Sequence, residues 1–140
     1  MTEDTARAHL QIGQVAERSE LSIKTIRHYD EVGLVTPSAR SAGGFRLYTE
    51  ADVERLLVIR RMKPLGFTLA EMKELLEALD VLEDSTSSAT LRRQAGATLD
   101  VLRGKAQDSC ENLRRQLTYA EELTDLLTAR LDAEASSTIR

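Results

Sequence analysis

The segment from Ala89 to Leu131 contains no proline, and its only two glycines are Gly96 and Gly104. Apolar side chains recur in it every seven residues, with further leucines beside that row, which is typical of a long helix in a coiled coil. A helix of about 40 residues is roughly 60 Å long, and it cannot bury its apolar seam alone in a chain of this size. The expected dimerisation residues are Leu99, Leu102, Ala106, Leu113, Leu117, Ala120 and Leu127.

We therefore expect a long dimerisation helix over residues 88–131. The heptad row that contains Leu102 also contains Ser109 and Gln116, so the coiled coil is imperfect. An intramolecular hairpin of two helices, broken at Gly104, is the alternative, because it would cover the same seam without a partner.

Two short helices are predicted near the start of the chain, over residues 14–19 and 23–32. Ser22 is a good N-cap for the second of them. Gly33 supplies the left-handed residue that ends it. Two short helices separated by a brief turn are typical of a helix-turn-helix.

A small β-hairpin is predicted after Pro37. Residues 39–41 and 45–48 flank Gly43-Gly44, and paired glycines between short extended runs indicate a hairpin. We expect Phe45 to anchor this hairpin in the core rather than to insert between bases. Two further helices follow, since Thr49 with Asp52 and Thr68 with Glu71 form capping boxes.

The fold class expected from these elements is mainly α. A winged helix-turn-helix head with a small β-hairpin wing is predicted over residues 10–80, followed by the long coiled-coil dimerisation helix. The remaining residues, 1–9 and 132–140, are predicted to be flexible tails.

The net charge of −4 hides an uneven distribution of charge along the chain. Residues 22–66 carry eight lysines and arginines against five acidic residues, a local charge of +3. Residues 67–140 carry nine basic and fourteen acidic residues, a local charge of −5. Because a polyanion responds to local charge, this pattern is compatible with DNA binding by the first half of the chain.

The polar face of the helix over residues 23–32 is suited to the major groove of DNA, where Lys and Arg donate to guanine and Thr contacts the thymine methyl group. The basic hairpin beside it can contact phosphates, because Gly44 lets the backbone approach them. A third basic group ends the next helix. Solvated surface is the alternative for each group, and packing at the hairpin base is the alternative for Tyr48. The candidate DNA-binding residues are Lys24, Thr25, Arg27, His28, Tyr29, Arg40, Gly44, Arg46, Tyr48, Arg60 and Arg61.

Together these segments resemble the MerR family of bacterial transcription regulators. The resemblance rests on Ile12-Gly13-Gln14-Val15-Ala16, on Thr25-Ile26-Arg27-His28-Tyr29-Asp30 followed by Gly33-Leu34, on Gly44-Phe45-Arg46-x-Tyr48, and on Leu65-Gly66-Phe67-Thr68-Leu69. These motifs occur in the order and with the spacing that are typical of the family.

The resemblance implies a homodimer with an antiparallel pair of long helices, which binds a near-palindromic operator inside a promoter. It also implies that the dimer bends and untwists this DNA, so that the promoter elements come into register for RNA polymerase. Three positions depart from the family's pattern. Glu20 stands where relatives usually have a turn glycine, His28 replaces a frequent tyrosine, and Pro64 is expected to shorten the third helix.

The sequence does not identify an effector. Metal-sensing relatives place cysteines at the start of the dimer helix and in a loop after it, where residues 85–88 and 133–138 of this chain contain neither Cys nor His. We therefore expect no metal site and no cofactor, and a small-molecule effector stays open. The single cysteine, Cys110, is expected to be a packed small hydrophobe rather than a redox switch.

Two other functions share parts of this pattern. An effector-independent repressor or architectural protein would bind DNA in the same way without any ligand-dependent change. A coiled-coil interaction adaptor without DNA binding would have no need of Arg27 and Arg46. An enzyme is not expected, because His9 and His28 are the only histidines and no nucleophile–base pair is visible.

The expected location is the cytoplasm, in association with the nucleoid. The first residues are polar and acidic, unlike a secretory signal. No apolar run approaches the roughly 18–20 residues that are needed to span a bilayer.

Overall fold

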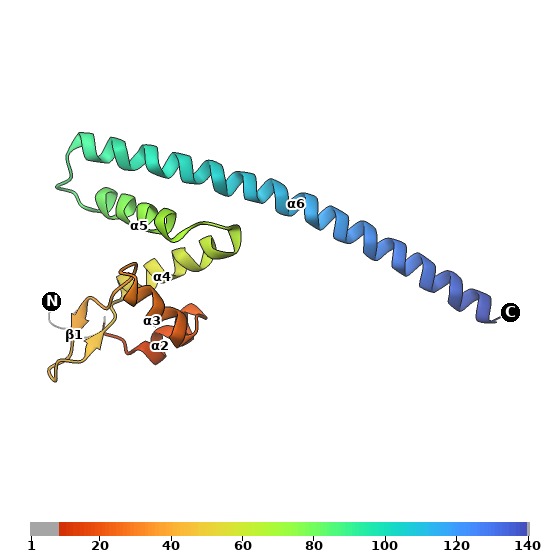
Figure 1. Cartoon of the computed structure of the whole chain (residues 1–140), viewed down its shortest axis with the longest axis horizontal. Coiled ribbons are helices and arrows are strands. Elements are labelled where there is room, and N and C mark those ends of the chain that lie inside the picture. Colours follow the sequence, from red (N-terminus) through yellow and green to blue (C-terminus); the bar gives the residue numbers. More distant parts are fainter. Residues whose placement is uncertain (1–8, 140) are drawn as a thin grey trace. The chain divides into compact units, whose positions relative to one another are not determined.

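A computed structural model describes residues 9–139 of the chain (Figure 1). Apart from His9, the tail predicted over residues 1–9 lies outside the described residues. The chain divides into two compact units between Leu99 and Asp100. The elements, in order, are α2 (Ile12–Ser19), α3 (Ile23–Glu31), β1 (Ala39–Arg40), β2 (Arg46–Leu47), α4 (Glu50–Met62), the 3₁₀ helix η1 (Lys63–Leu65), α5 (Leu69–Glu83) and α6 (Ala89–Ile139).

The predicted helix-turn-helix is confirmed as α2 and α3. The Ser22 hydroxyl accepts a hydrogen bond of 3.0 Å from the backbone N–H of Thr25, as expected of an N-cap. Gly33 follows the end of α3 with a φ of +73°, in the left-handed region that favours glycine. These two residues therefore fix where the second helix of the motif begins and ends.

The turn between α2 and α3 contains Glu20 in the left-handed region, with a φ of +60°. This conformation costs a non-glycine residue roughly 1 kcal/mol. Arg60 of α4 lies across the turn, where its Nη1 donates to the backbone carbonyl of Ser19 at 2.9 Å and to the Glu20 carboxylate at 3.4 Å. The guanidinium thus satisfies a carbonyl at the end of α2, which has no partner within the helix.

The predicted wing is an antiparallel hairpin in which Ala39 pairs with Leu47 and Arg40 pairs with Arg46. Strands of two residues are too short to be stable alone. The hairpin base is tied to the start of the chain by an isolated bridge, in which the Leu10 and Tyr48 backbones exchange hydrogen bonds of 2.7 and 2.8 Å. At the tip, Gly44 has a φ of +84°.

The head packs around α4, which contacts α2, η1 and α5 (Figure 1). The apolar residues on its buried side are Val53, Leu56, Ile59 and Met62. Both predicted capping boxes are present, with Thr49 and Asp52 at the start of α4 and Thr68 and Glu71 at the start of α5. α4 ends at Met62, two residues before Pro64, which lies in η1.

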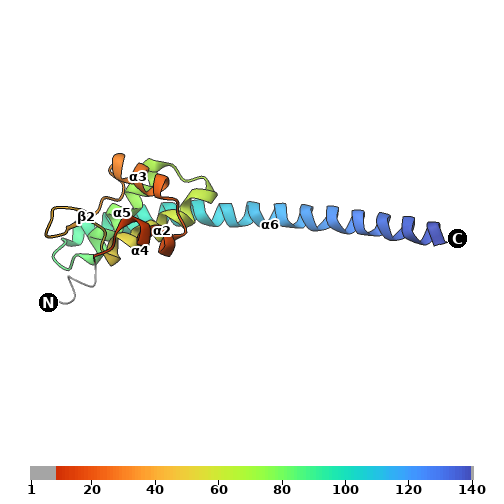
Figure 2. The same cartoon turned by 90° about the horizontal axis from the view of Figure 1, so that it is seen from below.

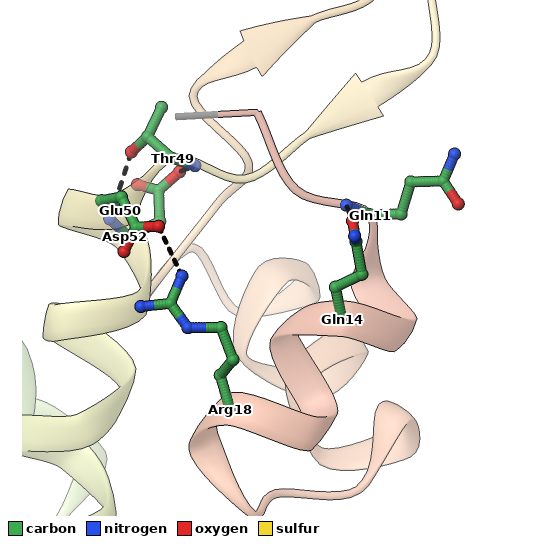
Figure 3. Close-up of polar contacts among 6 residues, drawn as sticks. All are labelled: Gln11, Gln14, Arg18, Thr49, Glu50 and Asp52. Carbon is green, nitrogen blue, oxygen red and sulfur yellow. Dashed lines mark hydrogen bonds and ion pairs between the residues drawn. The ribbon is translucent and has the colours of Figure 1, made fainter. Parts of the chain in front are cut away.

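The Asp52 carboxylate is nearly buried, at 6% exposure, and carries more than a capping role. One of its oxygens, Oδ2, accepts hydrogen bonds from the Thr49 N–H at 2.9 Å, the Ser38 N–H at 3.1 Å and the Ser38 hydroxyl at 2.7 Å. Figure 3 shows Asp52 beside Thr49 at the start of α4, with Arg18 of α2 pointing to the same turn. Arg18 forms an ion pair with Glu50. Asp52 thereby joins α4 to the segment that leads into the wing.

The long helix α6 begins at Ala89 and continues to Ile139 (Figure 2). The prediction that this helix ends at Leu131 is therefore wrong, and residues 132–139 of the predicted tail are helical. The reason is local, because Asp132, Ala133, Glu134 and Ala135 contain no helix breaker and include favourable helix formers. The first turns of α6, up to Leu99, belong to the same compact unit as the head.

The segment between α5 and α6 covers residues 84–88, because α5 continues to Glu83 and α6 begins at Ala89. Arg92 of α6 holds this segment, since its guanidinium donates to the carbonyls of Leu82 and Asp84 at 3.2 Å each. The Ser88 hydroxyl accepts from the Leu91 N–H at 3.1 Å and so caps α6. Among residues 9–139, no helix is both long enough and apolar enough to cross a membrane.

The first prediction concerns Asp52. We expect Asp52→Ala to lower the free energy of unfolding by about 2–3 kcal/mol, because it leaves the N–H groups of Ser38 and Thr49 without their acceptor. Chemical denaturation followed by circular dichroism measures this change. Glu54→Ala, which removes an exposed carboxylate from the same helix, is the control and should stay within about 0.5 kcal/mol of the parent. Equal stability of the two variants would contradict the role given to Asp52.

The second prediction concerns Arg60. Arg60→Met keeps most of the aliphatic stem but removes the donor to the Ser19 carbonyl, so we expect a loss of about 1–2 kcal/mol in the free energy of unfolding. Arg61→Met is the matched control, because Arg61 is exposed. A loss of the same size in both variants, measured by urea denaturation, would show that Arg60 does not support the turn.

Candidate nucleic-acid interface

The exposed face of α3 carries most of the side chains that the sequence predicts to read bases. Lys24, Arg27 and His28 are exposed, and Thr25 is half-buried. The Thr25 hydroxyl lies 2.8 Å from the Ser22 hydroxyl, so it also takes part in capping the helix. Three donors with a basic or ring nitrogen thus project from one short helix, which is the arrangement that a major-groove reader requires.

Tyr29 does not belong to this face. Its side chain is buried in the head, and burial raises the pKa of its hydroxyl above the usual value. The prediction that Tyr29 contacts DNA is therefore not supported by its position. The helical period explains the difference, because Tyr29 lies three residues after buried Ile26 and so faces the core.

A groove of about 400 Å³ lies beside α3, between that helix and the start of α5. Lys24, Thr25 and His28 line it from α3, and Lys63 lines it from η1. Its remaining lining is mainly apolar and consists of Tyr29, Phe67, Leu69 and Met72. The sequence does not predict this groove, because Lys24 and Lys63 come together only when η1 folds next to α3.

The wing carries Arg40, Gly44 and Arg46, and all three are exposed. Arg40 lies opposite Arg46 in the hairpin, and its Nη1 donates to the Gly44 carbonyl at the tip over 3.3 Å. Phe45 is 75% exposed, so the prediction that it anchors the wing in the core is wrong. Gly43 and Gly44 turn the chain so tightly that Phe45 stays at the tip, in contact range of Gly43 and away from the core.

Arg46 is paired within the protein. Its Nη1 and Nη2 donate to Oδ2 and Oδ1 of Asp30, each at 3.0 Å. This fork links the wing to the last turn of α3. Asp30 is not among the residues that the sequence predicts to be functional, and no local signal points to it, because the two partners are 16 residues apart.

Tyr48 follows the wing and is buried, so packing rather than DNA contact is its place in the structure. Burial is the main cause that raises the pKa of its hydroxyl, and the Asp30 carboxylate adds to the shift. The positive charges of Arg46 and Arg27 act in the opposite direction. The wing, α3 and this tyrosine therefore form one electrostatically connected corner of the head.

The basic residues at the end of α4 differ in whether they are hydrogen-bonded within the protein or exposed to solvent. Arg60 is engaged with Ser19 and Glu20, and its phosphate contact stays a prediction. Arg61 is exposed and remains suited to a polyanion, as is Lys63 in η1. The positions of these residues on α4 explain the split, because Arg60 faces the turn of the helix-turn-helix and Arg61 faces solvent.

The predicted dimerisation residues are largely unburied from Leu113 onward. Leu113 and Leu127 are 48% and 53% exposed, Leu117 is 59% exposed and Ala120 is also exposed. Leu102, by contrast, is only 4% exposed in the single chain and has little surface left for a partner, while Leu99 and Ala106 are half-buried. Cys110 is exposed, so the expectation that it is packed is not met in the single chain.

Two family models match the chain. The model described as "MerR HTH family regulatory protein" matches residues 10–79, and the model described as "MerR, DNA binding" matches residues 53–133. Together they cover the helix-turn-helix, the wing, α4, α5 and most of α6.

Curated relatives agree with these models. The HTH-type transcriptional activator mta of Bacillus subtilis (strain 168) is 51% identical over 67 residues, which are 48% of this chain and 26% of that protein. The HTH-type transcriptional regulator CueR of Vibrio cholerae is 34% identical over 109 residues, 78% of this chain and 69% of that protein. HmrR of Rhizobium leguminosarum bv. viciae is 36% identical over 110 residues, 79% of this chain and 82% of that protein. The chain thus spans about a quarter of the Bacillus activator and most of the other two.

Solved structures share the fold. The transcription regulator PbrR691 from Ralstonia metallidurans CH34, in complex with lead(II), has a TM-score of 0.51 and 32% identity, and the match covers 84% of each chain. HiNmlR, a MerR family regulator lacking the sensor domain and bound to promoter DNA, has a TM-score of 0.58 and covers 88% of this chain and 87% of its own. At 23% identity, the second likeness concerns the fold alone.

The matched residues begin before the helix-turn-helix and continue through the wing far into α6, so the chain belongs to the MerR family of helix-turn-helix regulatory proteins.

Proposed function

We propose that this protein regulates transcription by binding a promoter operator as a homodimer. The observation that carries the proposal is the exposed row of Lys24, Arg27 and His28 on α3, beside a wing that also carries basic side chains. In a member of a DNA-binding family, this row has the composition and the helical setting of a recognition helix.

The exposed apolar side chains of α6 support the homodimer. Leu113, Leu117 and Leu127 are each about half exposed. Leu113 and Leu127 lie two heptads apart, and Leu117 follows Leu113 by about one helical turn. Burying them against a second copy removes apolar area from water at about 25 cal/mol per Å². An antiparallel pair of α6 helices would give the dimer a two-fold axis, and such an axis calls for a near-palindromic operator.

Distortion of the operator and action on RNA polymerase are the finer parts of the proposal. Two heads on one rigid pair of helices contact two half-sites at a fixed spacing, so the DNA has to adapt to the protein. Membership of the MerR family supports this part. The place of action is then the cytoplasm, where the promoter DNA is.

The competing functions receive less support. An adaptor without DNA binding gives no reason for the exposed basic row on α3, and membership of a family of transcriptional regulators gives no support to an enzyme. An effector-independent repressor uses the same interface, and it differs from a sensing regulator only in the response of the complex to a ligand.

The third prediction tests the recognition helix. Arg27→Ala should weaken binding to the operator by about 1–3 kcal/mol if Arg27 donates to a guanine, and it should reduce the preference over scrambled DNA. Fluorescence anisotropy against the upstream promoter fragment and a scrambled fragment, at two salt concentrations, measures both effects. Arg93→Ala removes an exposed arginine from α6 and is the control. Equal affinities of parent and Arg27→Ala protein for both fragments would contradict the proposed reading helix.

The fourth prediction tests the homodimer. Leu113→Lys combined with Leu127→Lys should convert the dimer to a monomer, because two charges would be buried at the seam without partners. Sedimentation equilibrium measures the change. Gln107→Lys adds the same kind of charge at an exposed position about 120° around the helix from Leu113 and should leave the dimer intact. A dimer that survives the double substitution would place the interface elsewhere.

A further inference from the structure

The ion pair between Asp30 and Arg46 is the polar link between the recognition helix and the side of the wing. Both terminal nitrogens of the guanidinium donate to the two carboxylate oxygens, each over 3.0 Å. Two parallel bonds of this kind fix the plane of the guanidinium as well as its distance, and charge-assisted bonds are the stronger class of hydrogen bond. The pair therefore specifies an orientation between β2 and α3.

The wing needs such a link. Each of its strands has only two residues, and a hairpin of this size is not stable by itself. Its base is tied by the bridge between Leu10 and Tyr48, but its tip carries an exposed Phe45 and left-handed Gly44. Arg46 lies between base and tip, directly opposite Arg40, so the contact with Asp30 braces the middle of the hairpin.

The location of Asp30 indicates why its negative charge needs a partner. It lies in α3, one turn after Arg27, at the edge of the surface that is proposed to face DNA. An unpaired carboxylate there would repel the phosphates of a bound duplex. Arg46 neutralises that charge, and the opposite effects of Asp30 and Arg46 on the pKa of the Tyr48 hydroxyl are consistent with both charges lying at this corner.

We propose that Arg46 is a positioning residue that holds the wing against α3 through Asp30, and that Arg40 provides the wing's contact with phosphate. The proposal rests on the proposed DNA-binding function. It replaces the assignment of Arg46 to a phosphate, because Asp30 holds two of the five N–H donors of the guanidinium and fixes its plane. Arg40 makes a single bond of 3.3 Å to a carbonyl at the tip and can turn to a phosphate at little cost.

Asp30→Asn separates the two possible roles of Arg46 by the sign of its effect. If Arg46 positions the wing, losing the carboxylate releases the wing and weakens operator binding. If Arg46 binds a phosphate directly, Asp30 competes with DNA for it, and Asp30→Asn tightens binding. Anisotropy titrations with the promoter fragment decide between them for the parent protein, Asp30→Asn, Arg46→Gln and the double variant.

We expect each single substitution to lower affinity about tenfold and the double variant to be no weaker than the weaker single one, since contacting residues are not additive. The salt dependence adds a second readout. Arg40→Gln should reduce the slope of log K against log salt by about 1, and Asp30→Asn and Arg46→Gln should leave it unchanged. Tighter binding by Asp30→Asn, or a flatter slope in Arg46→Gln, would overturn the proposal.

Hydrogen exchange of the DNA-free protein tests the brace independently of function. The Ser41 N–H donates to the Phe45 carbonyl at 2.8 Å inside the wing, so its exchange reports opening of the hairpin. Asp30→Asn and Arg46→Gln should speed exchange at Ser41 several-fold, whereas Arg40→Gln should not. Unchanged exchange in both variants would overturn the proposal, and faster exchange in a protein that binds no DNA would refute the proposed function alone.

Discussion

Packing against α4 is the constraint on which the rest of the head depends. The helices α2 and α3 have eight and nine residues, and helices of that length do not persist in water without tertiary contacts. Val15 of α2, Ile26 of α3 and Leu56 and Ile59 of α4 are completely buried. Their shared core holds the two short helices at a fixed angle. The exposed row on α3 can serve as a reading surface only because its opposite side is buried in this way.

Polar contacts also hold the segments of the head together, and most of these contacts are made by arginines. Arg60 supports the strained turn between α2 and α3, Arg18 pairs with the first turn of α4, and Arg46 links the wing to α3. Each contact joins segments that are far apart in sequence. Several arginines of the head are therefore committed to its own architecture. Lys24, Arg27, Arg40, Arg61 and Lys63 are among the exposed basic residues that remain for a polyanion.

The long helix α6, unlike the head, exposes much of its apolar surface. From Leu113 onward its apolar side chains are exposed in the single chain, and a two-stranded coiled coil would cover them. The dimer would thus obtain its stability from α6, while the head supplies recognition. This division explains why the acidic charge of the second half does not prevent DNA binding by the first half.

The helices, turns and hairpin of this protein can be predicted from the amino-acid sequence, because the signals for these elements are local. The boundaries of the short helices follow from Ser22, Gly33 and the two capping boxes. The turn of the hairpin follows from Gly43-Gly44, and the long helix follows from the heptad spacing. The end of α6 was missed because the residues after Leu131 fall outside the heptad pattern, although they still favour a helix.

Which side chains of the head are exposed and unengaged depends on long-range packing. Tyr29 and Tyr48 are buried, Arg60 is engaged with the turn, Arg46 is paired with Asp30, and Phe45 is exposed at the wing tip. Residue type and spacing suggest a DNA contact for the tyrosines and arginines alike, and a place in the core for Phe45. Their actual roles depend on partners 16 or more residues away, or on the direction in which a tight turn points a ring, and neither is encoded in local sequence. Long-range packing is the physical reason that elements could be predicted and contacts could not.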